Sequence, residues 1–289
     1  MLSNLKVLAR TLTYIWSHPN CQKKQVQSIY RFFEWQIYKR IGYQHLDLEL
    51  APGVQLRCYP DSHSASAVLY CGLYDYNEMN FLLRYLRPED SFLDVGANVG
   101  VYTLLAASKI TSGSIYSIEA LPKNYERLKE NIVLNQFERI QTYQLAVSDK
   151  EGMIELSLND GDSTPSILGQ NSGHKLIVKT DMLDNILPNG THLTLAKMDV
   201  EGAELLVLKG AKSLLKNPVF VWILEILGTS AIELVDFLNS YGYRLYQYSA
   251  DANRLYPVTL EQKQGNNVLA IHNDHLDLVT ERLSSHPQN

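Results

Sequence analysis

Short apolar runs that end close to an acidic residue recur along this chain, and they predict an open α/β sheet. The first run, residues 91–95, contains Asp94 and is followed by a turn with glycine at positions 96 and 100. Apolar positions at helical spacing follow from residue 101 to residue 107. A buried strand, a tight turn and a helix in this order form the first βα unit of a nucleotide-binding sheet. Gly96 and Gly100 would let the backbone turn sharply and approach a ligand closely.

Three later runs, residues 114–119, 140–146 and 193–198, have the same character and predict three more strands. The first of these ends in Glu119, about twenty residues after the glycine turn, where βαβ nucleotide folds place the carboxylate that binds ribose hydroxyls. The last is followed directly by Asp199. Because the carboxyl ends of parallel strands meet at one edge of a sheet, we expect the acidic groups to converge on one crevice.

The spacing of the glycine turn indicates the ligand. A dinucleotide fingerprint requires the pattern G-x-G-x-x-G, whereas Asn98 stands here in the place of the middle glycine and the third glycine follows two residues later. S-adenosylmethionine has no phosphate groups to place on the helix N-terminus, and it fits this spacing better. The alternative is a tight strand-to-helix turn that binds no ligand.

Four segments, in this order and at this spacing, carry a resemblance to a known family. They are DVGANVG at 94–100, EALP at 119–122 followed by Asn131 and Asn135, AVSDKEG at 146–152, and KMDVEGAE at 197–204. On these segments the chain resembles the FkbM-type methyltransferases. These are class I S-adenosylmethionine-dependent enzymes, mostly O-methyltransferases of sugars and secondary metabolites. Ala120 departs from the family, which usually has proline there, and we expect the change to be tolerated.

The resemblance implies the class I methyltransferase fold, a Rossmann-like open α/β sheet of mostly parallel strands joined by helical crossovers. Residues 219–224 would form the fifth parallel strand. Residues 243–248 and 267–272 would add an antiparallel closing pair.

Two helices, over 3–16 and 24–41, and a β-hairpin over 46–59 are predicted before this sheet. The predicted division of the chain is an N-terminal helical and hairpin extension (1–65), an S-adenosylmethionine-binding methyltransferase domain (66–275) and a frayed tail (276–289).

The acidic residues at the strand ends have distinct expected roles. Glu119 would bind the ribose, and Asp94 would order the turn and bind the amino group of the cofactor. Asp199 would lie beside the first strand and reach the reacting centre, where alignment and proton removal are the main tasks. Glu201 either opens the following helix, where its charge suits the helix dipole, or takes part in catalysis. Lys197 is given no role.

Glu78 has two interpretations, because it stands at capping-box spacing from Asp75 at the start of a helix predicted over 75–86. It either caps this helix or contacts the amino end of the cofactor. No metal is predicted, since Asp199 and Glu201 alone offer too few ligands. The predicted catalytic residues are Asp199 and Glu201, and the predicted cofactor-binding residues are Glu78, Asp94, Gly96, Ala97, Asn98, Gly100, Glu119, Ala120, Ala146, Val147 and Asp199.

The helix predicted over 24–41 is rich in aromatic and basic side chains. Residues 1–46 carry seven Lys and Arg against a single acid, Glu34, whereas the whole chain has a net charge of −5. The acidic remainder argues against nucleic acid as a partner. The helix either packs its aromatic face on the main domain with its basic face in solvent, forms a homodimer contact or substrate cover, or makes a peripheral contact with an anionic membrane.

Composition bears on membrane insertion and on the cellular compartment. The chain of 289 residues is 45% hydrophobic and has no uncharged apolar run long enough to span a membrane. Its three cysteines lack metal-ligand spacing, which indicates a reducing compartment, and we expect a cytoplasmic protein without a signal sequence.

The predicted function is S-adenosylmethionine-dependent O-methylation of a small molecule, at a hydroxyl or carboxyl group of a sugar or natural product. Residues 159–174 lack periodicity, and we expect this segment and residues 1–65 to select the acceptor. The alternatives are a non-catalytic or membrane-surface protein that retains the cofactor fold, and an NAD(P)-linked dehydrogenase. Asn98 and the acidic fourth strand end speak against the dehydrogenase.

Overall fold

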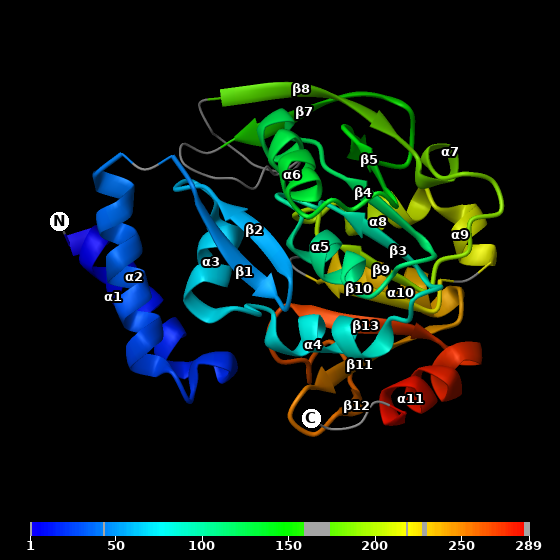
Figure 1. The fold of residues 1–289 in the computed structure, drawn as a ribbon. Coiled ribbons are helices and arrows are strands. Elements are labelled where there is room, and N and C mark those ends of the chain that lie inside the picture. The colour runs from blue at the N-terminus through cyan, green and yellow to red at the C-terminus, as the bar shows by residue number, and fades with distance from the viewer. Residues whose placement is uncertain (1, 43, 159–173, 218, 227–229, 286–289) are drawn as a thin grey trace.

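The computed structural model describes residues 2–42, 44–158, 174–217, 219–226 and 230–285, and its centre is an eight-stranded sheet (Figure 1). From one edge to the other the strands are β12 (Arg254–Pro257), β11 (Tyr243–Ser249), β13 (Asn267–His272), β10 (Val221–Glu225), β9 (Leu195–Met198), β3 (Ser91–Val95), β4 (Ser114–Ile118) and β5 (Ile140–Tyr143). The strands from β10 to β5 pair in parallel, and β13 pairs antiparallel with both β10 and β11. The predicted α/β fold class, with five parallel strands and an antiparallel closing pair, is confirmed.

Both faces of the sheet are covered, because successive residues of each strand enter different hydrophobic clusters. Phe92 of β3 belongs to one cluster and Leu93 to the other. The first cluster includes side chains of α4 (Tyr76–Tyr85), α5 (Val101–Ala107) and α11 (Leu276–Ser284). The second includes side chains of α7 (Leu183–Ile186), α8 (Glu204–Lys209), α9 (Lys212–Lys216) and α10 (Ala231–Ser240).

The N-terminal extension forms the predicted helices and hairpin, and Figure 1 shows them to one side of the sheet. The helices are α1 (Leu2–Ser17) and α2 (Gln25–Arg40), joined by a 3-10 turn (Pro19–Cys21). The hairpin is β1 (Leu46–Ala51) and β2 (Val54–Cys58). A helix that the sequence analysis did not predict follows, α3 (His63–Cys71), and it spans the predicted boundary at residue 65. None of the described helices is both long and apolar enough to cross a membrane.

Three local predictions were wrong. They concern the extent of the third strand, the frayed tail and the cap at Asp75. The strand predicted over 140–146 ends at Tyr143, because Ala146–Val147 (β6) leaves the sheet to pair with β8 (His174–Asp181). β8 also pairs with β7 (Gly152–Leu158) in a second, three-stranded sheet. The segment expected to select the acceptor lies outside the described residues except for its last position, which begins β8.

The tail predicted to be frayed is helix α11 as far as Ser284. Val279 and Leu283, one turn apart, are buried against the core, and the Arg282 Nη1 atom lies 2.6 Å from Asp90 Oδ2. Tertiary packing therefore orders a segment that has weak local signals.

The capping box predicted at Asp75 does not form, since the Asp75 side chain accepts no hydrogen bond from the first turn of α4. It accepts one instead from the Tyr102 hydroxyl, at 2.9 Å. A tertiary partner has replaced the local one.

Two asparagines attach the hairpin to the sheet domain. Asn131 lies on α6 (Pro122–Leu134), and Asn135 is the C-cap of that helix. Asn131 is fully buried; it accepts a hydrogen bond from the Arg57 backbone N–H at 2.7 Å and donates one to the Val99 carbonyl at 2.8 Å. Asn135, which is only partly buried, bonds both backbone groups of Gln55. The two amides thereby pair backbone groups on the open edge of β2.

Replacing Asn131 with alanine should lower the free energy of unfolding by about 2–4 kcal/mol, because the buried Val99 carbonyl loses its partner at roughly 1–3 kcal/mol and the part-buried Arg57 N–H loses its partner at about 1 kcal/mol. Asn135→Ala, at a site that water reaches, is the matched control and should cost about 1 kcal/mol. Denaturant unfolding of both variants checks this. Equal losses would show that Asn131 has no special part in holding the hairpin.

Candidate active site

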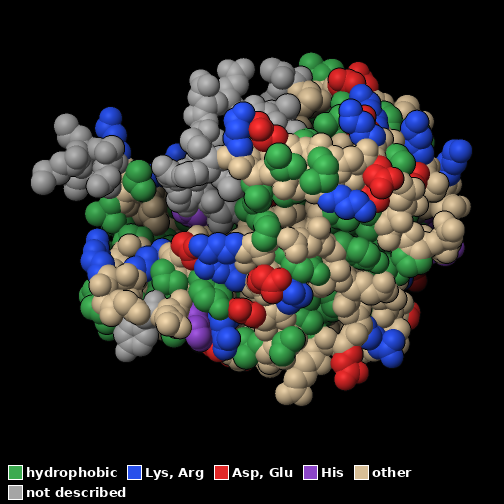
Figure 2. Space-filling view, turned by 90° about the horizontal axis from the view of Figure 1, so that it is seen from above, with side chains coloured by type: hydrophobic (Ala, Val, Ile, Leu, Met, Phe, Trp, Pro, Cys, Tyr) green, Lys and Arg blue, Asp and Glu red, His purple; other side chains and the backbone are tan. Residues whose placement is uncertain are grey.

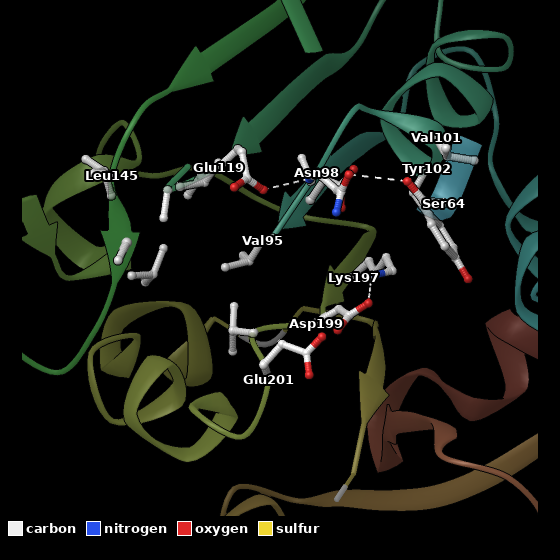
Figure 3. A pocket seen from close by; sticks show the side chains of 18 of the residues that line it. Ser64, Val95, Asn98, Val101, Tyr102, Glu119, Leu145, Lys197, Asp199 and Glu201 are labelled. Carbon is white, nitrogen blue, oxygen red and sulfur yellow. Dashed lines mark hydrogen bonds and ion pairs between the residues drawn. The ribbon is translucent and has the colours of Figure 1, made fainter. Parts of the chain in front are cut away.

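A cavity lies at the carboxyl ends of β3, β4 and β9 (Figure 3). Glu78 and Gly100, two of the predicted cofactor-binding residues, are not among the residues that line it. Gly100 instead begins α5, where a Cβ atom would lie 2.6 Å from the Leu128 side chain. The predicted residues that do line the cavity are Asp94, Gly96, Ala97, Asn98, Glu119, Ala120, Ala146, Val147, Asp199 and Glu201.

The turn after β3 requires glycine at position 96, for a different reason from the one expected. Gly96 has a φ of +78°, and a Cβ atom there would lie 2.0 Å from the Asp199 carbonyl oxygen. Gly96 borders the cavity. The space beside it is also occupied by the backbone that follows the neighbouring strand, β9. Asn98 has a φ of +53°, a conformation that asparagine tolerates better than most residues.

Glu119 is tied to this turn from the end of β4. Its two carboxylate oxygens accept hydrogen bonds from the backbone N–H groups of Asn98 and Leu121, each at 2.8 Å (Figure 3). Burial raises the pKa of Glu119 to about 7. Because a carboxylate has about four acceptor positions, these bonds leave Glu119 able to accept from a ligand hydroxyl group as well.

Asp94 lines the cavity, and one of its carboxylate oxygens has no hydrogen-bond partner among the described residues. Its Oδ2 atom accepts a hydrogen bond from the Thr103 hydroxyl at 2.6 Å. Its Oδ1 atom is buried and has no hydrogen-bond partner among the described residues. Burial raises the pKa of Asp94, although the neighbouring charge of Lys197 opposes the shift. A buried acceptor without a partner fits a ligand that brings a donor, such as an ammonium group.

Lys197, to which no role was assigned, extends into the cavity from β9. Its ammonium lies 3.0 Å from Asp199 Oδ2 and 4.8 Å from the centre of the Tyr102 ring. Burial lowers the pKa of Lys197, but the charges of Asp199, Asp94 and Asp75 more than offset burial and raise the pKa above its usual value. The positive charge of Lys197 is therefore balanced by carboxylates of the protein itself.

A third carboxylate joins the two predicted catalytic acids. The carboxylate oxygens of Asp199, Glu201 and Glu225 lie within 4.8 Å of one another. Burial, together with the charges of the other two acids, raises the pKa of Glu225 to about 7. Glu225 directly follows the predicted fifth strand, residues 219–224, and the sequence analysis gave it no role. That position, beside the fourth strand end, was the signal that could have identified it.

The helix after β9 begins later than expected. One of the two interpretations of Glu201 was that it opens this helix, but α8 starts at Glu204, and Glu201 lies in the preceding turn with a φ of +53°. The Glu204 carboxylate accepts hydrogen bonds from the backbone N–H groups of Val200 and Gly202, at 3.3 and 3.2 Å. Glu204 thus orders the turn, and Glu201 reaches the cavity from it.

Further residues, to which the sequence analysis gave no role, complete the lining. The apolar end is formed by side chains that include Val95, Ile118, Leu145 and Leu156. The polar end includes His63, Ser64, Tyr74 and Tyr102. The Ser64 hydroxyl donates to the Asn98 side-chain oxygen at 3.2 Å, so α3 contacts the turn directly.

Glu78 lies in the first turn of α4 and outside the cavity lining. Burial, and secondarily the charge of Asp75, raises the pKa of Glu78 to about 7. Its predicted contact with the cofactor remains a prediction.

Comparison with known proteins gives a family match over the region that forms this cavity. A family model described as the methyltransferase FkbM domain matches residues 94–245. The chain is 29% identical over 153 residues to the hexuronic acid methyltransferase AglP of Haloferax volcanii, covering 50% of this chain and 59% of that protein. It is 28% identical over 148 residues to Methyltransferase 1 of Beauveria bassiana, covering 43% and 59%. The chain thus spans about three fifths of the length of these curated relatives.

Among solved structures, the methyltransferase FkbM from Methylobacillus flagellatus KT is similar with a TM-score of 0.46 and 15% sequence identity. The match covers 72% of this chain and 54% of that one.

Gly96→Ala should lower the free energy of unfolding by about 3 kcal/mol or more, since the added methyl group combines left-handed strain with overpacking against Asp199. Gly53→Ala is the matched control, because Gly53 has a φ of +76° but nothing within 4 Å of an added Cβ atom. It should cost only the strain, roughly 1–2 kcal/mol. Denaturant unfolding of both proteins measures the difference. A loss at Gly96 no larger than at Gly53 would contradict the packing argument.

Proposed function

Because the chain belongs to the FkbM methyltransferase domain family, we propose that it transfers a methyl group from S-adenosylmethionine to a hydroxyl group of a small molecule. S-adenosylmethionine is the methyl donor of this family, and it supplies an electrophilic methyl group on a positively charged sulfur. The observation that supports the proposal most directly is the charge of the cavity. Four acidic residues, Asp94, Glu119, Asp199 and Glu201, line it, and Lys197 is paired to one of them.

This charge suits a cationic ligand and opposes the pyrophosphate of a dinucleotide. The same acids that attract a sulfonium and an ammonium group would repel phosphate groups. The lining therefore favours a methyltransferase over the dehydrogenase alternative.

The residues of the cavity fit the parts of S-adenosylmethionine. Glu119 would accept hydrogen bonds from the ribose hydroxyls with its remaining lone pairs. The open Oδ1 atom of Asp94 would accept one from the amino group, satisfying a buried acceptor that the described residues leave unpaired. The apolar end, with Ile118, Val147 and Leu156, would enclose the adenine ring.

The group of Asp199, Glu201 and Glu225 favours a hydroxyl over a carboxyl as the acceptor. A carboxylate acceptor already has a free electron pair and would be repelled by three neighbouring acids. A hydroxyl must lose its proton during transfer, and a carboxylate with a pKa of about 7 is well matched to take it near neutral pH. We assign proton removal to this group, with Glu201 on the cavity side and Glu225 behind it.

A sugar is the acceptor class that the relatives support. The relative AglP is named as a hexuronic acid methyltransferase, and hexuronic acids carry both hydroxyl and carboxyl groups. The acidic group argues that this chain would methylate a hydroxyl of such a sugar, so the product would be a methyl ether. Alkaline hydrolysis followed by mass spectrometry separates the two cases, because an ether keeps its methyl group and an ester loses it.

Glu119→Ala should weaken binding of S-adenosylmethionine and of its demethylated product by about tenfold to several hundredfold, because two hydrogen bonds to a charged acceptor are lost. Wild-type affinity should rise as the pH is raised through about 7, since Glu119 accepts best when ionised. Titration calorimetry measures both effects, with exposed Glu138→Ala as the control. Unchanged affinity in Glu119→Ala would remove this residue from the site, and tight binding of NADH instead would support the dehydrogenase.

Glu225→Gln should reduce kcat by about a hundredfold or more, because general-base catalysis contributes roughly 10²–10⁴. In the wild type the rate should rise with pH through about 7. In the variant this rise should be lost, because the group that titrates near 7 is replaced by an amide that does not ionise. The assay measures methyl transfer to hexuronic acids, with exposed Glu151→Gln as the control. An unaltered pH profile would show that Glu225 takes no part.

A further inference from the structure

Helix α2 has two apolar stripes on opposite sides, and only one of them packs on the protein. The inner stripe, Ser28, Phe32 and Trp35, is buried. The outer side carries Val26, Tyr30, Phe33, Ile37 and Ile41, whose exposed fractions run from 47% to 77%. These positions repeat at intervals of three and four residues, so they form one continuous stripe along the helix and its C-cap. The interpretation that α2 packs its aromatic face on the main domain therefore holds for the inner stripe and not for the outer one.

Exposed apolar side chains are concentrated in this part of the molecule. Eight of the thirteen large hydrophobic side chains that are exposed among the described residues lie between residues 7 and 41. Single exposed apolar residues are ordinary, but a stripe of five on one helix indicates an interaction surface.

Basic residues surround the stripe. Lys23 and Lys24 precede the first turn of α2, Arg31 follows Tyr30, and Arg40 lies one turn beyond Ile37. All four are exposed, and Figure 2 shows Lys and Arg side chains beside hydrophobic ones on the N-terminal helices. Residues 1–46 hold seven basic residues and one acid, in a chain whose net charge is −5.

We propose that the outer stripe of α2 and its basic rim dock the protein on an anionic lipid surface. Apolar and aromatic side chains on one helix face, bordered by Lys and Arg, are the features with which an amphipathic helix enters the boundary between headgroups and acyl chains. The charge selects this occupant over a second copy of the chain. A symmetric dimer through the stripe would place two strongly basic segments against each other, whereas anionic lipids neutralise them.

The docking helix is firmly joined to the catalytic unit. Its buried Trp35 donates a hydrogen bond to the Ser66 hydroxyl of α3 at 3.0 Å. The same short helix supplies His63 and Ser64 to the cavity. A lipid surface held by α2 would therefore sit at a defined position relative to the cavity.

Sedimentation of the full chain with vesicles tests the proposal. Binding is expected to equimolar phosphatidylcholine and phosphatidylserine, and to be weak or absent with phosphatidylcholine alone. Phe33→Ser and Ile37→Ser should each reduce partitioning by about tenfold, whereas Ile232→Ser, at a side chain of α10 that is 68% exposed, should not. Arg31→Gln combined with Arg40→Gln should reduce it by about 25-fold, at about fivefold for each basic residue. The control pair is Arg139→Gln with Lys150→Gln, at exposed sites elsewhere.

Unaltered far-UV dichroism and affinity for demethylated cofactor establish that each variant is folded, so these measurements do not depend on the acceptor. No binding to the anionic vesicles, or equal loss in the stripe and control variants, would overturn the proposal. It would also be overturned if the wild type formed dimers that Phe33→Ser dissociates, with no vesicle binding. The stripe would then be an interface between two copies.

Discussion

The buried ammonium group of Lys197 is the charge around which the cavity is arranged. Asp199 directly follows the strand that carries Lys197, Asp94 comes from β3, and Asp75 directly precedes α4. Burying any one of these groups alone would cost several kcal/mol, and only their mutual proximity makes the arrangement stable. The pairing holds two adjacent strand ends and one helix start in register, and it leaves an excess of negative charge facing the ligand.

The architecture followed from the sequence because its signals are local. Apolar runs of strand length, each ending near an acid, predict Asp94, Glu119 and Asp199 at one edge of the sheet. Glu225 was missed because its character depends on two acids distant in the sequence. The cap at Asp75 failed because Tyr102, on another helix, competes for the same carboxylate. Helix α3 has no charged side chain and few of the usual start signals beyond Ser62, whose hydroxyl accepts from the Ala65 N–H.

The glycine turn shows how one residue meets two demands. Gly96 borders the cavity, but the atom that an added Cβ would approach most closely is the Asp199 carbonyl oxygen. The turn after β3 is therefore packed directly against the end of β9. Asn131 extends this arrangement outward, since one amide joins the Val99 carbonyl in the turn to the backbone of the hairpin. The N-terminal extension is thereby connected to the same turn that borders the cavity.

The strand order has a consequence for how the chain is made. β3 is the middle one of the five parallel strands. It lies between β4, which is synthesised next, and β9, whose Leu195 pairs with Phe92 from much earlier in the chain. While the ribosome is still translating the intervening crossovers, one edge of β3 lacks its partner, and Asp94 and Asp75 lack the lysine that compensates them. At this stage the sheet exposes an unpaired strand edge, together with carboxylates that are buried in the folded protein. Both features disfavour a compact intermediate of the nascent chain. The pairing that places Lys197 among these carboxylates can therefore form only after β9 has left the exit tunnel.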